Sequence, residues 1–288
     1  MDAPLAVTRV THSCHLIEIG GLTLLTDPWF SERAAYHPGE PIAFGVADLP
    51  DLDAVLISHH HFDHCDLESF ASYRDKDVPM LVAAPVVERA RKAGFRQVRA
   101  LYPWESTRLG AHAGRAGRAA TTAAAGDITT GREPATGRDG IAGGSFGRDE
   151  LTITAVPARH RVYEVTFVVQ GGGQTVYFAG DTLLVPELQE LAGRFPDIDL
   201  LLVPTNGLRL RPLFNRQVVM SAQEAATLTS WLRPRVAVPH HYAYSSGPVG
   251  DRLITKTDRD PQNYVRAARL AAPGTDVRVI APGERLTV

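Results

Sequence analysis

Hydrophobic positions in the first part of the chain form short runs of strand length. Three runs, at 6–9, 14–19 and 22–26, are rich in β-branched and aliphatic residues, and the last two are joined by Gly20-Gly21, a two-residue hairpin signal. A fourth run, DAVLIS at 53–58, has no regular polar alternation. Such a run is typical of a strand buried on both faces. The pattern therefore predicts a sheet that opens with a meander.

Helical and strand patterns alternate in the rest of the chain. Helices are predicted at 66–74, 85–94, 186–195, 221–232 and 260–270. Ser221 and Glu224 have the spacing of a capping box. Strands are predicted at 80–84, 98–102, 151–158, 166–170, 174–182, 199–205 and 236–242 and within 276–288.

The segment 111–149 differs from its surroundings. It is rich in Ala, Gly, Thr and Arg, with almost no large apolar residue and no periodicity, which is typical of a surface insertion. On either side of it the chain has the same plan, several strands followed by strand-helix alternation. We therefore expect one domain, 1–288, of the α/β class: a four-layer αββα sandwich of two mixed β-sheets with helices on the outer faces.

Composition and charge narrow the function classes. The chain has 288 residues, of which 44% are hydrophobic and 22% charged, and a formal net charge of -2. This balance gives no general attraction to nucleic acid or to an acidic membrane surface. No run approaches the roughly 18 apolar residues of a membrane span, and MDAPLAV lacks the features of a signal peptide. We expect a cytoplasmic protein that acts on a small molecule, with a homo-oligomer left open.

Candidate chemistry is concentrated in SHHHFDHCD, residues 58–66, directly after the buried strand at 53–58. The motif holds four of the 11 histidines, two aspartates and one of the two cysteines. His59 and His61 are two apart at a strand end, so their side chains can share a side and grip one ion. Asp63 and His64 follow and could serve a second ion. A polar surface turn would explain one histidine, but not this set, so the motif predicts a metal site.

Partners for this motif must come from elsewhere in the chain. Three candidates each follow a predicted strand: His160 in VPARH, Asp181 in YFAGDT, and His240 or His241 in VPHHY. Ligands often gather where strands of a sheet end. Nitrogen and carboxylate ligands suit zinc, and also manganese or iron.

These motifs together resemble a known superfamily. SHHHFDHCD is similar to the HxHxDH signature of the metallo-β-lactamase superfamily, and PARH, FAGDT and VPHHY follow in that family's order. THSCHLIE, LTDPWF and DLPDLDAVLISHHHFDHCD most resemble the branch that contains ascorbate-6-phosphate lactonase and N-acylphosphatidylethanolamine phospholipase D. The resemblance covers nearly everything except 111–149, and it implies the four-layer fold expected above.

The resemblance also implies a dinuclear site, most readily of two Zn²⁺ ions, with Mn²⁺ or Fe²⁺ as alternatives. One ion would be held by His59, His61 and His160. The second would be held by Asp63, His64 and His241, and Asp181 would bridge both. His241 is preferred to His240 because the family's ligand stands two after a proline and just before an aromatic, here Pro239 and Tyr242.

Other residues match positions near the family's site. His12 and Asp27 are expected behind the ligands or in loop structure rather than on the metal. Asp66, Arg161 and His240 are further candidates for supporting the ligands or contacting substrate. Four arginines near strand ends could hold an anionic substrate by bidentate contacts: Arg159, Arg161, Arg209 and Arg211.

Two divalent ions would define the reaction. They can lower the pKa of a shared water to about 7, which provides a metal-bound hydroxide, and they polarise the bond under attack. Asp63 can orient that nucleophile and pass a proton to the leaving group, so it is the catalytic candidate. The superfamily's di-iron reductases typically carry glutamate where this chain has His61, which favours hydrolysis over redox chemistry. We expect a hydrolase of a small ester, a phosphodiester first and a lactone second, with a non-catalytic metal-binding relative as the remaining alternative.

Overall fold

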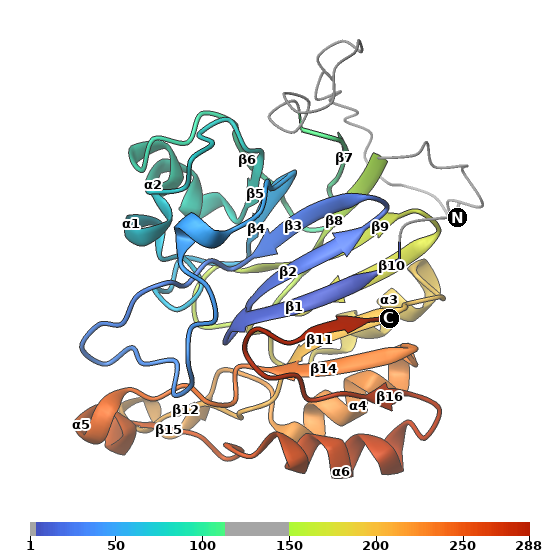
Figure 1. Ribbon diagram of the computed structural model, residues 1–288. Coiled ribbons are helices and arrows are strands. Elements are labelled where there is room, and N and C mark those ends of the chain that lie inside the picture. The colour runs from blue at the N-terminus through green and yellow to red at the C-terminus, as the bar shows by residue number, and fades with distance from the viewer. Residues whose placement is uncertain (1–3, 113–149) are drawn as a thin grey trace.

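The computed structural model describes residues 4–112 and 150–288, so all but the first two residues of the insertion expected at 111–149 lie outside the described part. Two seven-stranded sheets lie face to face (Figure 1). In spatial order, the first sheet contains β17 (Arg285–Thr287), β1 (Ala6–Thr11), β2 (Cys14–Ile19), β3 (Leu22–Thr26), β4 (Ala54–Ile57), β5 (Met80–Val82) and β6 (Val98–Ala100). The second contains β16 (Asp276–Val277), β14 (Val236–His240), β11 (Leu200–Pro204), β10 (Gln174–Phe178), β9 (Val165–Gly171), β8 (Glu150–Pro157) and β7 (Ser106–Gly110).

Both sheets mix strand directions. In the first sheet β1, β2 and β3 are antiparallel, and β3 to β6 are parallel. In the second, β7 to β10 are antiparallel, and β10, β11, β14 and β16 are parallel. The hairpin between β2 and β3 turns at Gly20 and Gly21, whose φ angles of 57° and 81° suit glycine. Every residue of β4 is buried, as the continuous apolar run predicts.

Helices cover the outer faces of the sheets. Phe70 of α1 (Leu67–Phe70) and Ala90 of α2 (Val87–Lys92) belong to the same apolar cluster as β4 and β5. Apolar side chains of α3 (Glu190–Arg194), α4 (Ala222–Leu232) and α6 (Pro261–Ala271) pack on the other side of the second sheet. The capping box at the start of α4 is present, with the Ser221 and Glu224 side chains each accepting from the other's backbone N–H. The predicted four-layer arrangement is confirmed.

Several short elements depart from the sequence-based prediction. A three-stranded sheet of β13 (Arg216–Gln217), β12 (Arg209–Leu210) and β15 (Ile254–Thr255) lies beside α5 (Gly247–Leu253). None of these elements, nor β7, was expected. Two-residue strands are too short to show a period, and α5 has no buried residue, so it has no apolar stripe. The helix expected at 66–74 is a single turn. Four 3-10 helices complete the described elements: η1 (Val46–Asp48), η2 (Ala84–Val86), η4 (Pro186–Gln189) and η5 (Arg211–Leu213).

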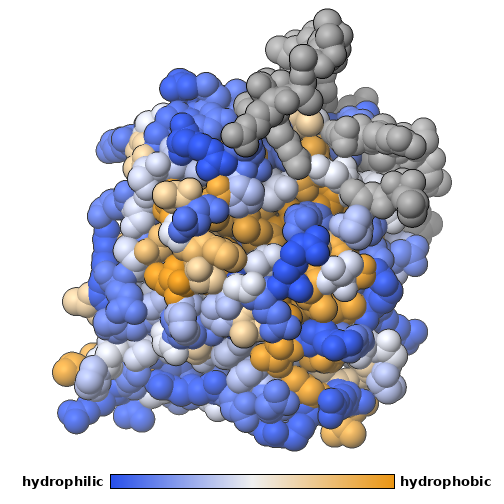
Figure 2. Space-filling view, viewed as in Figure 1, coloured by the Kyte–Doolittle hydropathy of each residue, from blue (hydrophilic) through white to orange (hydrophobic). Residues whose placement is uncertain are grey.

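One face of the molecule carries both hydrophobic and hydrophilic side chains. In the view of Figure 2, hydrophobic side chains gather over the middle of the face, and hydrophilic ones cover most of its margins. Within residues 4–112 and 150–288, no helix has the length and apolar character needed to cross a membrane.

Candidate metal centre

The predicted ligands meet where strands of both sheets end. Asp27 follows β3, the motif at 58–66 follows β4, His160 follows β8, Asp181 follows β10, and His241 follows β14. The two sheets are joined here by a backbone hydrogen bond from Val165 N–H to the carbonyl of Ser58, 3.1 Å long. The residues are far apart in sequence, and the topology of the two sheets brings them to one edge.

Three imidazoles form the first group. The Nδ1 of His61 lies 2.9 Å from Nε2 of His59 and 3.2 Å from Nε2 of His160. Two nitrogens bound to one tetrahedral zinc at the usual distances lie roughly 3.3 Å apart. Three ring nitrogens this close could hold one metal ion.

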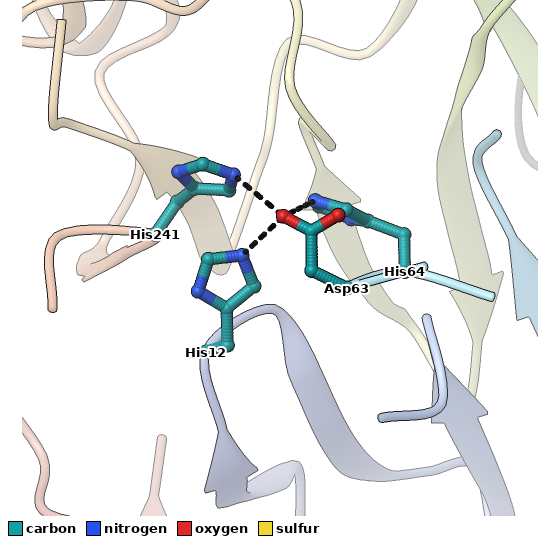
Figure 3. Close-up of side chains that lie close together, drawn as sticks. All are labelled: His12, Asp63, His64 and His241. Carbon is teal, nitrogen blue, oxygen red and sulfur yellow. Dashed lines mark ion pairs between the residues drawn. The ribbon is translucent and has the colours of Figure 1, made fainter. Parts of the chain in front are cut away.

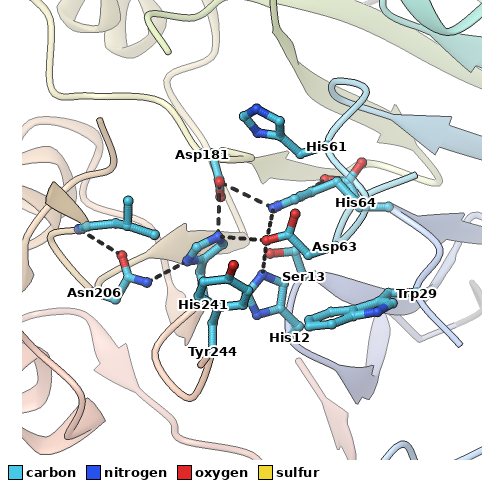
Figure 4. Close-up of polar contacts among 12 residues, drawn as sticks. His12, Ser13, Trp29, His61, Asp63, His64, Asp181, Asn206, His241 and Tyr244 are labelled. Carbon is cyan, nitrogen blue, oxygen red and sulfur yellow. Dashed lines mark hydrogen bonds and ion pairs between the residues drawn. The ribbon is translucent and has the colours of Figure 1, made fainter. Parts of the chain in front are cut away.

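Asp181 belongs to a second group. Its Oδ2 lies 2.9 Å from Nε2 of His241 and 3.2 Å from Nε2 of His64. Asp63 Oδ2 lies 3.8 Å from each of the same two nitrogens. Figure 4 shows these side chains pointing to one another, with His61 on the far side of Asp181 from His12.

His12 joins the second group. It stands in the turn between β1 and β2, and its Nε2 lies 3.6 Å from Oδ2 of Asp63. The ligand-type atoms of His12, Asp63, His64 and His241 all lie within 4.8 Å of one another (Figure 3). His12 is therefore closer to the predicted second metal position than a residue expected only behind the ligands.

Unsatisfied buried atoms test whether metal fits here. Oδ1 of Asp63 and Oδ1 of Asp181 are buried, and neither makes a hydrogen bond to a described residue. A buried polar atom without a partner costs about 1–3 kcal/mol. Nε2 of both His64 and His241 faces the same two carboxylates. These oxygen and imidazole nitrogen atoms match the ligands of zinc, manganese or iron. The residues present fit such ions.

Further contacts hold the imidazole rings in place. Asp27 Oδ2 lies 2.6 Å from Nδ1 of His64, and the same carboxylate accepts hydrogen bonds from the backbone N–H and hydroxyl of Ser58. The carbonyl of Val218 lies 2.7 Å from Nδ1 of His160. Partners at the second ring nitrogen orient a ligating histidine and are part of most metal sites.

Burial and charge set the protonation of the histidines. Burial lowers the pKa of His61 to about 4 and that of His59 well below its ordinary value. Burial and then His241 lower the pKa of His12 to about 3. Burial also lowers the pKa of His64, but Asp181, Asp63 and Asp27 outweigh it and hold that pKa well above the ordinary value. Neutral imidazoles are the form that binds metal, so the first group is ready for an ion near neutral pH.

Two residues that the sequence did not single out support the site. Glu164 is buried; its Oε1 accepts a 2.6 Å hydrogen bond from the N–H of Asp181 and lies 3.6 Å from Nδ1 of His59. Asn206 places its Nδ2 2.7 Å from Nδ1 of His241. Asn206 directly follows the strand end at 199–205, the same position that singled out the predicted ligands, so that signal could have found it. Glu164 precedes a strand and carries no such signal.

The backbone is left-handed at three residues of the site. His12, Asp27 and His241 have φ angles of 47°, 34° and 63°. A non-glycine residue in this region costs roughly 1–2 kcal/mol, because Cβ crowds the carbonyl. At His241 the turn separates its ring from that of His240, whose Nδ1 lies 3.0 Å from the hydroxyl of Ser13 and whose ring stacks on Phe178. His240 thus lies on the side away from the ligand groups.

The remaining candidates divide between the site and the scaffold. Arg161 lines the cavity above the ligand groups. Asp66, expected to support the ligands or contact substrate, caps α1 by accepting from Ser69 N–H and also accepts from Phe30 N–H and the Ser31 hydroxyl. Its place at the first turn of a helix directs the carboxylate to backbone N–H groups instead of the cavity.

Comparison with known proteins agrees with this geometry. A family model described as a beta-lactamase superfamily domain matches residues 23–242. UPF0173 metal-dependent hydrolases of Deinococcus radiodurans and Caldivirga maquilingensis are 25% and 24% identical to the chain. The alignments cover 97% and 96% of this chain, and 98% and 95% of those proteins.

Solved structures share the fold. Igni18, a metallo hydrolase from Ignicoccus hospitalis, aligns with a TM-score of 0.65 at 21% identity and covers 99% of both chains. The isothiocyanate hydrolase from Delia radicum gut bacteria aligns with a TM-score of 0.68 at 17% identity and covers 98% of both. The chain belongs to the β-lactamase superfamily and has the fold of its metallo-hydrolases.

Proposed function

We propose that this protein is a metal-dependent hydrolase with a dinuclear site that cleaves a small ester, in the first place a phosphodiester. The observation that carries the proposal is the pair of neighbouring ligand groups, whose His59 and His64 rings lie 4.2 Å apart, together with the buried Oδ1 atoms of Asp63 and Asp181 that no described residue satisfies. The names of the aligned relatives, metal-dependent hydrolases, support the same class of reaction.

In this proposal the seven predicted ligands divide as the family resemblance implies. His59, His61 and His160 would hold one ion. Asp63, His64 and His241 would hold the other, and Asp181 would lie between the two. Zinc is the first candidate for both positions, with manganese and iron as alternatives, because every donor is an imidazole nitrogen or a carboxylate oxygen.

The side chains around the ions have separate tasks. When bound, the ions would activate a water for attack and polarise the ester oxygen. Asp63, whose Oδ1 makes no hydrogen bond to a described residue, would orient that water and carry its proton towards the leaving group. Asp27 and Glu164 would keep His64 and Asp181 in position, since their carboxylates contact these residues directly.

The type of ester is the finer part of the proposal. The sequence resemblance to the branch with lactonase and phospholipase D members supports phosphodiesters and lactones. The cation of Arg161 in the cavity wall favours the diester, which is anionic at neutral pH, over a neutral lactone. Lactone opening is therefore the second candidate. A non-catalytic metal-binding role is the third, and the complete set of ligands weighs against it.

Metal content together with turnover tests the proposal. We expect close to two transition-metal ions per chain by inductively coupled plasma mass spectrometry, and hydrolysis of bis-(p-nitrophenyl) phosphate. His61→Ala and Asp181→Ala should lose metal and nearly all activity. His37→Ala is the control, because its ring pairs with Glu32 outside the cavity and should change neither quantity. A parent protein that is empty and takes up no zinc, manganese or iron would refute the proposal.

A further inference from the structure

Two connected cavities lie above the ligand groups. The inner cavity is lined by His61, Asp63, Asp181 and other site residues, together with Tyr36 and Arg161. The outer cavity shares Arg161, Leu210 and Ile254 with it. The inner cavity measures about 80 Å³ and the outer about 310 Å³. The inner cavity has room for a reacting ester group, and the larger outer cavity has room for the rest of a substrate.

The outer cavity is apolar apart from one residue. Besides Arg161, it is lined by Leu210, Pro212, Leu213, Gly250, Leu253 and Ile254. These residues come from the small sheet and its neighbours η5 and α5. Leu213 and Leu253 are 43% and 50% exposed, so the wall presents hydrocarbon to solvent. Such a surface gains by binding a hydrocarbon group.

Arg161 stands at the junction of the two cavities. Its side chain is exposed, and within the described residues it makes no hydrogen bond and no ion pair. The hydroxyl of Tyr36, on the wall of the inner cavity, makes no hydrogen bond there either. The other arginines considered as anion ligands, Arg159, Arg209 and Arg211, line neither cavity. An available cation beside an apolar wall is complementary to an anion attached to a hydrocarbon group.

We propose that the substrate is an amphiphilic anion: its anionic ester group enters the inner cavity and pairs with Arg161, and its alkyl or other hydrocarbon group fills the outer cavity. The proposal rests on the proposed function, because it assigns the ester to that same site. Leu253 and Leu213 determine specificity for the hydrocarbon group, and Arg161 for the charge.

Alkyl p-nitrophenyl phosphates test the hydrocarbon part. In their hydrolysis water adds to phosphorus, the bond to the nitrophenyl oxygen breaks, and alkyl phosphate and p-nitrophenol form with the protons of water. With metal-loaded protein below micelle-forming concentrations, kcat/KM should be about tenfold or more higher for octyl than for methyl, since each buried methylene contributes roughly two- to fourfold. A ratio near one would overturn the proposal.

Two matched leucine variants locate the effect. Leu253→Ser should lower the octyl-to-methyl ratio about threefold or more, because it replaces apolar wall with a hydroxyl. Leu270→Ser makes the same change on α6, at a leucine that is 88% exposed and lines neither cavity, and should leave the ratio unchanged. An equal effect of both variants, or of neither, would overturn the assignment. Light scattering gives a further test. If the parent protein is a dimer that Leu253→Ser dissociates, a second copy of the chain covers the outer cavity and the assignment is overturned.

Binding to metal-free protein separates this inference from the proposed reaction. Calorimetry should show octyl phosphate binding more tightly than methyl phosphate, and Arg161→Ala should weaken octyl phosphate about tenfold, as expected for a charged hydrogen bond. Arg159→Ala is the control and should leave the affinity for octyl phosphate unchanged, because Arg159 lines neither cavity. If diesters are hydrolysed but the octyl group is preferred in neither turnover nor binding, the inference about the substrate is refuted and the proposed hydrolase function stands. If octyl phosphate is preferred in binding but no diester or lactone is hydrolysed, the hydrolase function is refuted and the binding site stands.

Discussion

Single residues in the site act through neighbours that are distant in sequence. Glu164 contacts neither cavity, yet its carboxyl holds the backbone of Asp181 and approaches His59. Gly180, beside it, has a φ of 50°, and a Cβ there would lie 2.3 Å from Oε1 of Glu164. The chain therefore needs glycine before Asp181 for two reasons, backbone conformation and close approach of a carboxyl group.

Variants of Glu164 test whether its hydrogen bond or its charge supports Asp181. Burial and then Asp181 raise its pKa well above the ordinary value, which favours the neutral carboxyl. If the hydrogen bond to Asp181 N–H is what matters, Glu164→Ala should weaken zinc binding about 10- to 100-fold. Glu164→Gln, which keeps an acceptor oxygen, should restore most of it. Titration with zinc against a chromophoric competitor measures the zinc affinity of both variants. If the Gln variant binds zinc as weakly as the Ala variant, the negative charge of Glu164 is required.

At the scale of elements, the ligand motif was predictable because its strands are. The runs that form β4 and β11 are continuous and buried, and a ligand placed at the end of such a strand can be located from the sequence. The walls of the outer cavity could not be predicted from the sequence. α5, β12 and β15 bury little, and their position depends on polar contacts between side chains that no local pattern shows.

Asp251 is the centre of those contacts. It accepts hydrogen bonds from Ser245, Ser246, Lys256 and Arg259, and so ties α5 to the segment after β15. Burial raises its pKa, but these donors outweigh burial and hold the pKa well below the ordinary 3.8. A carboxyl whose folded pKa is depressed stabilises the fold above its unfolded pKa, and that stability is lost as the pH falls through the folded value.

Asp251→Asn should therefore destabilise the protein most near neutral pH. We expect a loss of about 1–3 kcal/mol at pH 7, the range for hydrogen bonds to a charged group, and a difference that shrinks below about pH 4. Thermal unfolding of both proteins across this pH range measures it. Asp276→Asn removes an exposed pair with Arg278 and should cost under about 1 kcal/mol. A difference between Asp251→Asn and the parent that is independent of pH would contradict the expectation.

At the scale of the whole molecule, the proposed metal sites connect the two sheets. His59, His61, Asp63 and His64 follow the first sheet's β4, whereas His160, Asp181 and His241 follow strands of the second. Each ion would therefore be held from both sheets at once. The sequence showed which residues could bind metal, but the crossing of the two sheets at one edge depends on the packing of the complete core.

Metal should consequently stabilise the fold as a unit. Adding zinc to metal-free protein at about 100 times its dissociation constant should stabilise it by about 2.7 kcal/mol per site and raise the unfolding midpoint in one transition. Differential scanning calorimetry measures the shift. Asp181→Ala should lose most of it, and His37→Ala should keep it. A metal-induced shift that is the same in Asp181→Ala and the parent would show that zinc stabilises the protein at another place.

The left-handed backbone at His12, Asp27 and His241 has a consequence for the evolution of the chain. Glycine or asparagine would relieve the backbone at each of them. At Asp27 and His241 the gain would be offset, because the contacts of Asp27 with Ser58 and His64 and of His241 with Asn206 would be lost. At His12, whose ring nitrogens make no hydrogen bond to a described residue, nothing comparable would be lost. His12 is thus where a lineage released from selection for activity would gain stability in a single step, and where selection for a more heat-resistant protein would conflict most directly with its chemistry.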